Sequence, residues 1–277
     1  VVVGDEAGTA LTTGDNNVAL GFGALNDEDT GNYSTAIGSG TLSKQNNDAS
    51  NYNTAVGFEA GREVTSGINN TFIGASTGDA VTTGTESVAV GSNALSAAVA
   101  SDKNTALGAY ALRNDQEGES SVAVGHQALN AQNFTTATSA YNVAVGANAG
   151  VSVSTGTQNT LVGGLAGDAL TTSTGNVALG YNALSTATTG NLNVAVGNSA
   201  LANSSASNNT AVGFAANQLN TTGSSNVSVG YVALNANTTG SDNTAVGAAA
   251  LDANTTGSNH TAVGQGALSG NRSEERR

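Results

Sequence analysis

A short glycine-containing phrase repeats from one end of the chain to the other, and it limits the possible folds more than any other feature. With the Gly of Val-Gly, Ile-Gly or Leu-Gly taken as station 0, the phrase occurs 16 times in 277 residues. Of the 15 spacings between copies, 12 equal the step from Gly57 to Gly74, which makes a 17-residue unit. A unit this short gains a core only by stacking on its neighbours. The station-0 glycines are Gly4, Gly21, Gly38, Gly57, Gly74, Gly91, Gly108, Gly125, Gly146, Gly163, Gly180, Gly197, Gly213, Gly230, Gly247 and Gly264.

Each station has its own chemistry. Station −1 is Val, Ile or Leu and station −3 is Thr or Val in all 16 copies, usually with Ala between them. Such β-branched residues at period two favour a short strand, which the following Gly ends. Ala-Leu at stations +3 and +4 is expected to start a second short strand. The sequence therefore predicts an all-β parallel β-solenoid, a β-roll of about 16 coils, in one repeat domain over 1–270. Residues 271–277 are expected to be a tail or the start of a following segment.

The orientation of the strand and the shape of the irregular copies are also predicted. We expect the Thr/Val side chains of stations −3 and −1 to face inward. The Ala column would then form an outward face of small residues, interrupted by Phe72 and Leu161. The longer copies at 39–52 and 127–141 should form loops that bulge outward.

Station −4 is the most informative polar position. An amide at one fixed station can donate to one neighbouring coil and accept from the other, which satisfies buried polar groups in stacked β structure. The alternative is that Asn only suits a turn before a strand. The remaining copies place Ser34, Ser87, Ser121 and His260 at this station. The predicted ladder residues are Asn17, Asn53, Asn70, Asn104, Asn142, Asn159, Asn176, Asn193, Asn209, Asn226 and Asn243.

Composition argues against several functional classes. The formal net charge is −13, and no basic patch could neutralise phosphates, so we expect no nucleic-acid partner. The absence of Cys excludes disulfides and thiolate metal sites. No apolar run approaches the roughly 20 residues of a membrane span, so the chain is not expected to be membrane-embedded. The two histidines, His126 and His260, fit no catalytic motif. We therefore expect no catalytic residues, no metal site and no cofactor, and predict that the chain is not an enzyme.

Two surface features are candidate contact sites. Asp27, Glu28 and Asp29 are expected to form a solvated acidic turn, with Ca²⁺ binding as the weaker alternative because the spacing of a known Ca²⁺ loop is missing. Aromatic residues recur directly after the station-0 Gly, on what should be one side of the stack. Packing at a subunit seam is their expected role, and sugar stacking is the alternative. These residues are Phe22, Phe58, Tyr181, Phe214 and Tyr231.

The repeat resembles a known group of surface proteins. The phrases at 104–108, 121–125 and 142–146 are similar to the head repeats of YadA-like trimeric autotransporter adhesins, and equally to β-roll repeats of phage and bacterial tail-fibre-like proteins. The repeat unit here is longer than the usual adhesin head unit. This resemblance implies a left-handed parallel β-roll in a homotrimer. It also implies attachment to a host or substratum surface, or fibre building, with an extracellular location on a cell surface or virion.

The sequence thus predicts a structural and adhesive fibre module that presents loops for attachment. An ice-binding β-solenoid is the alternative, since that class also stacks short coils with flat Thr-bearing faces. Ice binding needs a regular outward Thr array. Here Val shares the Thr column, which is expected to face inward, so the fibre module is favoured.

Overall fold

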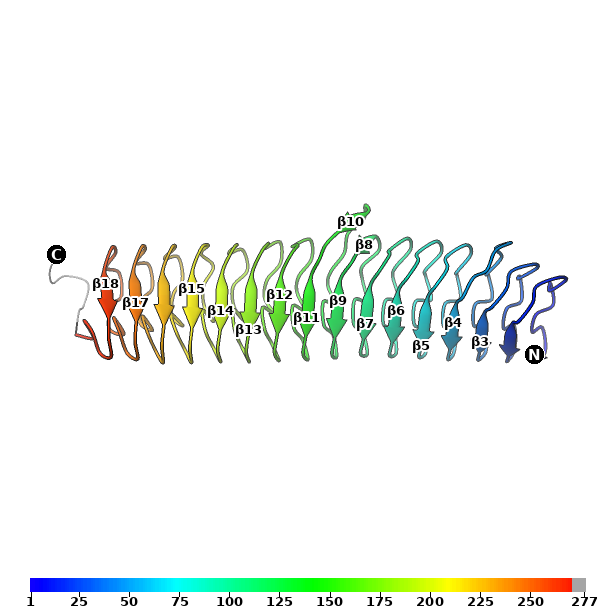
Figure 1. Cartoon of the computed structure of the whole chain (residues 1–277), viewed down its shortest axis with the longest axis horizontal. Helices are drawn as coiled ribbons and strands as arrows, with labels where there is room; N and C mark the ends of the chain where they lie inside the picture. The colour runs from blue at the N-terminus through cyan, green and yellow to red at the C-terminus, as the bar shows by residue number, and fades with distance from the viewer. Residues whose placement is uncertain (271–277) are drawn as a thin grey trace. The chain divides into compact units, whose positions relative to one another are not determined.

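The computed structural model describes residues 1–270, and over this range the chain is an all-β parallel solenoid without helices (Figure 1). The predicted fold class and repeat spacing are confirmed. Contacts divide the chain into two compact units, Val1–Tyr141 and the residues from Asn142 onward, and each is a stack of coils. The predicted tail, 271–277, lies outside the described residues.

One short strand forms in each coil, at stations −3 to −1. In the first unit these strands are β1 (Val2–Val3), β2 (Val18–Leu20), β3 (Thr35–Ile37), β4 (Thr54–Val56), β5 (Thr71–Ile73), β6 (Val88–Val90), β7 (Thr105–Leu107) and β9 (Val122–Val124). In the second unit they are β11 (Val143–Val145), β12 (Thr160–Val162), β13 (Val177–Leu179), β14 (Val194–Val196), β15 (Thr210–Val212), β16 (Val227–Val229), β17 (Thr244–Val246) and β18 (Thr261–Val263).

The strands pair in parallel with like stations opposite each other. Ala178 lies opposite Ala195, and Ala195 lies opposite Ala211, although the second step along the chain is one residue shorter than the first. Strands β3 and β4 keep the same register, with Ala36 opposite Ala55, across a step that is two residues longer than usual. Insertions and deletions are therefore absorbed in the turns, because a one-residue slip in a strand would exchange its two faces.

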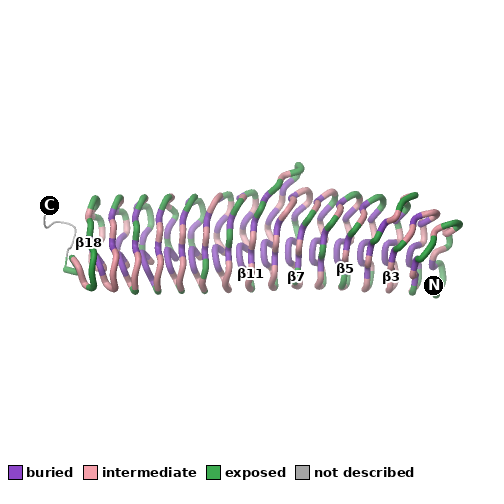
Figure 2. The backbone as a smooth tube through the Cα atoms, in the orientation of Figure 1, coloured by how far each residue is buried: buried purple, intermediate pink, exposed green. Residues whose placement is uncertain are grey.

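The predicted orientation of the strand is wrong. The station −2 side chain points inward and is fully buried, as at Ala55 and Ala178, whereas stations −3 and −1 are half-buried or exposed. Figure 2 shows buried and more exposed residues alternating along the coils. A coil this short encloses little space, and inward residues at stations +3 and +4 already occupy it. Where station +4 is Leu, only a small side chain fits at station −2, so the branched residues face outward.

The side chains at stations −2 and +4 share the same interior space, so a large residue at one station is matched by a small residue at the other. Eight of the 16 copies combine Ala at station −2 with buried Leu at station +4. Around Phe72 station +4 is Gly61 in one coil and Gly78 in the next, and Cβ atoms there would lie 2.9 and 2.6 Å from the Phe72 ring. Leu161 and Gly167 show the same exchange, at 2.7 Å. Phe72 and Leu161 are thus fully buried core residues. The sequence-based expectation that they interrupt an outward face of small residues is wrong.

Backbone conformation explains the station-0 Gly and corrects the predicted second strand. Gly213 has φ +135°, and a Cβ there would lie 2.4 Å from the carbonyl oxygen of Gly230 in the next coil. No L side chain fits that approach. Station +4 residues such as Leu251 (φ +51°) are left-handed, which costs about 1–2 kcal/mol per residue. The Ala-Leu segment is therefore a turn and not a strand, and burial of the Leu offsets the cost.

The two long copies form enlarged turns, as predicted. The first enlarged turn is residues 46–51, and the second is residues 133–140. The second carries β10 (Thr138–Ser139), which pairs in parallel with β8 (Gly118–Glu119) from the preceding coil. In Figure 1 this turn projects beyond the neighbouring coils of its unit. A parallel bridge joins Asn32 and Ser50 at the first enlarged turn.

Candidate interaction surfaces

The outward side of the strands is an uncharged, largely aliphatic face. Stations −3 and −1, which we name the strand face, hold only Thr, Val, Ile and Leu in all 16 copies. Leu20, Ile73 and Leu179 are among its exposed members, and 47% of Leu179 is accessible. Neighbouring strands are about 4.8 Å apart, so within each unit these side chains form continuous rows. Extended exposed apolar surface of this kind is typical of a contact site.

The five aromatic residues singled out in the sequence lie exposed beside the strand face. All of them follow the station-0 Gly, and Phe214 stacks on Tyr231 with ring centroids 5.5 Å apart. This stacking covers one ring face of each, and 51% of Phe214 and 61% of Tyr231 remain exposed. The exposed set is Phe22, Phe58, Tyr181, Phe214 and Tyr231.

A second aromatic row was missed by the sequence reasoning. Tyr33 and Tyr52, both at station −5, stack with centroids 5.1 Å apart. The available signal was the recurrence of Tyr directly before station −4.

A separate aromatic contact lies just after the station-0 Gly, with Tyr110 at station +2 and His126 at station +1. Tyr110 meets His126 edge to face at 6.1 Å, and the Arg113 guanidinium lies 5.2 Å from the Tyr110 ring centre. His126 is an exposed surface residue.

The station −4 amides lie inside the coils and link them. Asn226 is typical: its Oδ1 accepts the backbone N–H of Asn243 at 3.0 Å, and its Nδ2 donates to the carbonyl of Gly240 at 2.9 Å and to Oδ1 of Asn209 at 3.2 Å. His260 occupies this station and donates its backbone N–H to Asn243 Oδ1 at 3.0 Å. All eleven ladder residues named above are buried. Their contacts are structural and leave none of their side chains facing solvent.

A second inward polar column exists at station +7, and the sequence reasoning did not find it. Asn237 donates from Nδ2 to Oδ1 of Asn220, and Asn254 donates in the same way to Asn237, both at 3.1 Å. Other coils place apolar residues such as Val81 and Leu170 at this station. The sequence signal was the recurrence of Asn once per repeat, three residues before the turn Gly.

The predicted acidic turn does not behave as one solvated cluster. Asp27 pairs with Lys44 at 3.2 Å, and Asp29 accepts from the Thr12 hydroxyl. Glu28, between these two surface residues, points into the coil and is fully buried. The expectation of a solvated turn is therefore wrong for Glu28. Its carboxylate is occupied by donors from within the fold. Over residues 1–270 no three acidic or histidine side chains gather as a metal site would require.

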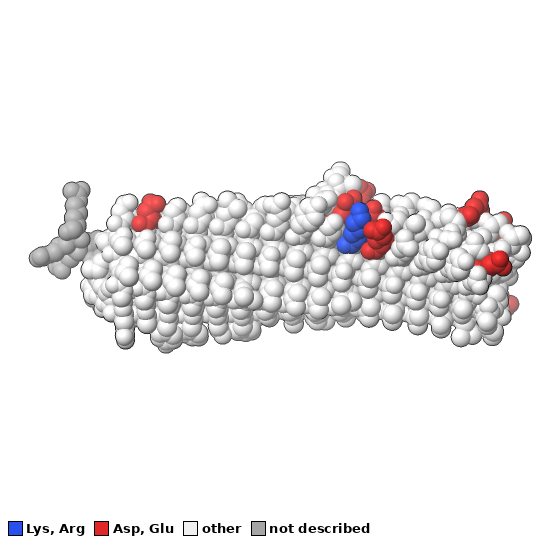
Figure 3. Space-filling model, in the orientation of Figure 1, with Lys and Arg blue, Asp and Glu red and all other residues white. Residues whose placement is uncertain are grey.

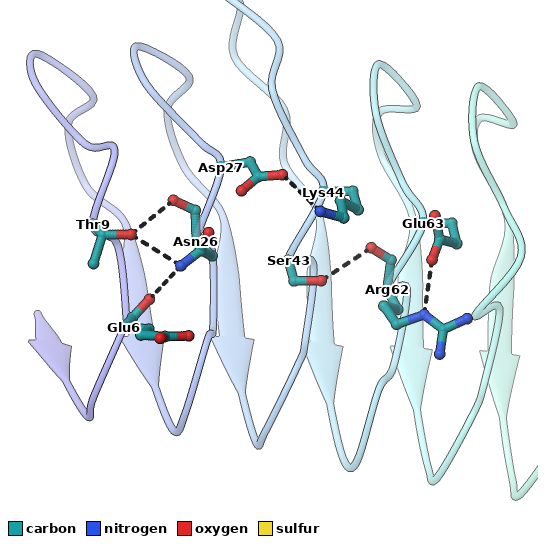
Figure 4. Close-up of polar contacts among 8 residues, drawn as sticks. All are labelled: Glu6, Thr9, Asn26, Asp27, Ser43, Lys44, Arg62 and Glu63. Carbon is teal, nitrogen blue, oxygen red and sulfur yellow. Dashed lines mark hydrogen bonds and ion pairs between the residues drawn. The ribbon is translucent and has the colours of Figure 1, made fainter.

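Other polar contacts tie successive coils together on the surface. Figure 4 shows one such region, where Asn26 donates to the carbonyl of Glu6 at 3.0 Å and to the Thr9 hydroxyl at 2.9 Å. Within a single coil, Arg62 pairs with the adjacent Glu63 at 2.9 Å. In the view of Figure 3 the charged side chains form small separate groups, and most of the surface is uncharged. Exposed pairs of this kind contribute about 0–1 kcal/mol each.

Burial perturbs three carboxyl groups. Desolvation raises the pKa of Asp115, although hydrogen bonds from the Phe134 amide, Gln132 and the Gly118 amide act in the opposite direction. Desolvation also raises the pKa of Asp79 and of Asp168. Asp115 lies in the interior of the first unit, where hydrogen-bond donors of the fold surround it. A structural role therefore fits it better than a role in catalysis.

Comparisons of the chain with protein-family models, curated proteins and solved structures give no significant match. In the described part of the chain, no helix has the length and apolar character needed to span a membrane. The strand face, the aromatic rows and the two enlarged turns are therefore the features on which a function can be argued.

Proposed function

We propose that the chain is a non-enzymatic structural and adhesive fibre module that assembles as a homotrimer through the strand face. The exposed aliphatic rows of stations −3 and −1 carry this proposal. Burying them at about 25 cal/mol per Å² of apolar area would stabilise an assembly, whereas leaving them in water favours aggregation. Because the same stations recur in every coil, one copy of the face can meet another along many coils.

The resemblance to trimeric adhesin and tail-fibre repeats supports the same assembly. It also supports an extracellular place on a cell surface or virion and a contact with a host or substratum surface. The enlarged turns are the natural contact elements, since binding residues are commonly carried on loops of a rigid scaffold. The aromatic residues beside the strand face would line the seam between subunits.

Sedimentation measures the assembly directly. The expected mass at micromolar concentration is three times 26.9 kDa, and a folded 26.9 kDa monomer would refute the trimer. Leu179→Asp, on the strand face, should weaken the assembly. Thr189→Asp, at an exposed turn in the same coil, is the matched control and should leave the mass unchanged.

The adhesive role has a separate test. Wild-type protein should attach to host or substratum cells. A variant in which the exposed tips 46–49 and 135–137 are replaced by Thr-Thr-Gly turns should attach less. Equal attachment of the two proteins would remove the enlarged turns as the contact, and no attachment by either would reduce the module to a spacer.

Ice binding is the second candidate, because the structure turns the Thr column outward and removes the argument against it. Thr stands at station −3 in eight of the 16 copies. Station −1 is aliphatic throughout, which makes the strand face more apolar than a Thr array and favours self-association first. Thermal hysteresis of the purified chain would support ice binding, and its absence would eliminate it.

A further inference from the structure

The two enlarged turns share an internal arrangement that the ordinary coils lack. Below the first enlarged turn, the buried carboxylate of Glu28 at station +7 accepts three hydrogen bonds. Its Oε1 accepts the Gly31 amide at 2.8 Å, and its Oε2 accepts Gln45 Nε2 at 2.7 Å and Asn51 Nδ2 at 3.0 Å. Gln45 also donates to the Ser34 hydroxyl at 2.8 Å. Asn51 belongs to the turn itself.

The second enlarged turn repeats this arrangement. Buried Asp115, again at station +7, accepts the amides of Gly118 at 3.1 Å and Phe134 at 3.0 Å through Oδ1. Its Oδ2 accepts Gln132 Nε2 at 2.6 Å, and Gln132 also donates to the Ser121 hydroxyl at 3.2 Å. Phe134 belongs to this enlarged turn. Both enlarged turns are thus accompanied by the same three residue types. These are an acid at station +7 of one coil, and Ser at station −4 and Gln at station +7 of the following coil.

The chemistry explains why an acid stands there. In an ordinary coil Asn220 occupies station +7, and its single side-chain oxygen accepts two donors, the Gly223 amide and Asn237 Nδ2 of the next coil, both at 3.1 Å. At an enlarged turn Gln takes the place of the next-coil Asn and the turn adds a donor of its own, so three donors converge on one buried point. An ionised carboxylate has two oxygens and only accepts, whereas an amide would oppose one donor with another. These donors offset part of the desolvation cost of the buried carboxylate, and the same donors left without an acceptor would be costly.

Each anchored turn exposes a tip and ends at an exposed tyrosine. Tyr52 follows the first enlarged turn and Tyr141 follows the second, with 55% and 57% of their surface accessible. Asn46 and Asp48 are exposed in the first turn, and Thr135 in the second. The tips are therefore available to a partner, while the base of each turn is fixed inside the coil.

We infer that Glu28 and Asp115 are positioning residues, which hold the two enlarged turns in one conformation for contact with a partner. The inference rests on the proposed adhesive function for its last step only. Holding a turn in its bound conformation lowers the entropic cost of binding. The set of acid, Ser and Gln would thus keep a longer contact turn ordered, although the coils on either side of it keep their usual size.

Amide hydrogen exchange in the full chain, followed by mass spectrometry, tests the anchor. In Glu28→Ala we expect residues 46–51 to exchange at least tenfold faster than in wild type. In Asp115→Ala we expect the same of the amides of Gly118 and of residues 133–140. Glu28→Gln and Asp115→Asn keep one oxygen and should give smaller local increases, which preserves the test if the Ala variants do not fold.

Val81→Ala is the matched control, because Val81 is buried at the same station beneath an ordinary turn. It should leave exchange at both enlarged turns unchanged. Unchanged exchange at the enlarged turns in the Glu28 and Asp115 variants would overturn the anchor, as would an equal increase in every coil.

Cell attachment separates the two ideas. Faster exchange at the turns together with weaker attachment supports the inference. Faster exchange with wild-type attachment overturns positioning for contact. If wild-type protein does not attach at all, the proposed adhesive function fails, and the exchange result alone still decides whether the two acids hold the turns.

Discussion

Around Phe72 a large residue at station −2 is matched by glycines at station +4. We therefore predict that Gly78→Leu lowers the free energy of unfolding in the wild-type protein and raises it in the Phe72→Ala variant. Phe72 fills the space that leucines at station +4 occupy in other coils, and Gly61 and Gly78 leave room for its ring. Phe72→Ala should lower the free energy of unfolding by about 3–5 kcal/mol, the usual cost of removing a buried phenyl ring.

Gly78→Leu in the wild-type background should also destabilise. A Cβ at residue 78 would lie 2.6 Å from two carbon atoms of the Phe72 ring, a distance that forces the ring or the backbone to move. Overpacking of this kind typically costs about 1–3 kcal/mol. The backbone at residue 78 has φ +57°, which adds about 1–2 kcal/mol for a non-Gly residue.

The same Gly78→Leu change should stabilise the Phe72→Ala variant. The removed ring leaves the space that Leu42, Leu95 and their equivalents fill elsewhere at φ near +50°. Burying a leucine contributes about 1.5–3 kcal/mol, which exceeds the backbone cost of about 1–2 kcal/mol over most of these ranges. The coupling energy between the two sites should therefore be on the order of 3 kcal/mol.

Chemical unfolding of the four proteins, followed by circular dichroism, measures this cycle. Because repeat arrays unfold in parts, exchange of the Gly74 and Gly91 amides, which bond to the neighbouring strands, gives the local stability. Equal destabilisation by Gly78→Leu in both backgrounds would refute the argument that Phe72 replaces the missing leucines.

Three further changes test the interior polar groups. Asn226→Ala should lower the free energy of unfolding by about 1–3 kcal/mol, because the Asn243 amide loses its acceptor. Asn226→Ser keeps an acceptor and should cost less in the same unfolding assay; equal losses would contradict the ladder. The raised pKa of Asp115 means that its contribution to stability is full below its ordinary value of 3.8 and is lost as pH rises through the raised pKa. Unfolding titrations from pH 4 upward should thus show a smaller pH dependence in Asp115→Asn than in wild type. Asn217 is buried at station +4 with neither side-chain atom hydrogen-bonded within residues 1–270. Asn217→Leu should raise the melting temperature and add about 1–3 kcal/mol, and a decrease would show that the amide is needed.

The repeat and its chemistry could be predicted from the sequence for a physical reason. In a parallel stack, like stations lie opposite each other, so a constant repeat length already implies the register and the position of each strand. The same reasoning indicated the asparagine ladder, since an amide at one fixed station can bond to the coils on both sides. The enlarged turns followed from the two long spacings. The second column, Asn220, Asn237 and Asn254, could have been predicted in the same way, because Asn recurs there at one fixed station.

The tertiary structure alone decided which side of each strand is buried and where the acids lie. Thr-Ala-Val alternates equally well in either orientation, and only the volume enclosed by a closed coil selects the small Ala for the interior. Nothing near Glu28 or Asp115 in the sequence marks them as buried, because most of their hydrogen-bond donors arrive from the next coil and its enlarged turn, one repeat or more further along the chain. Burial of a charge depends on donors brought together in three dimensions, and the closure of successive coils brings them there.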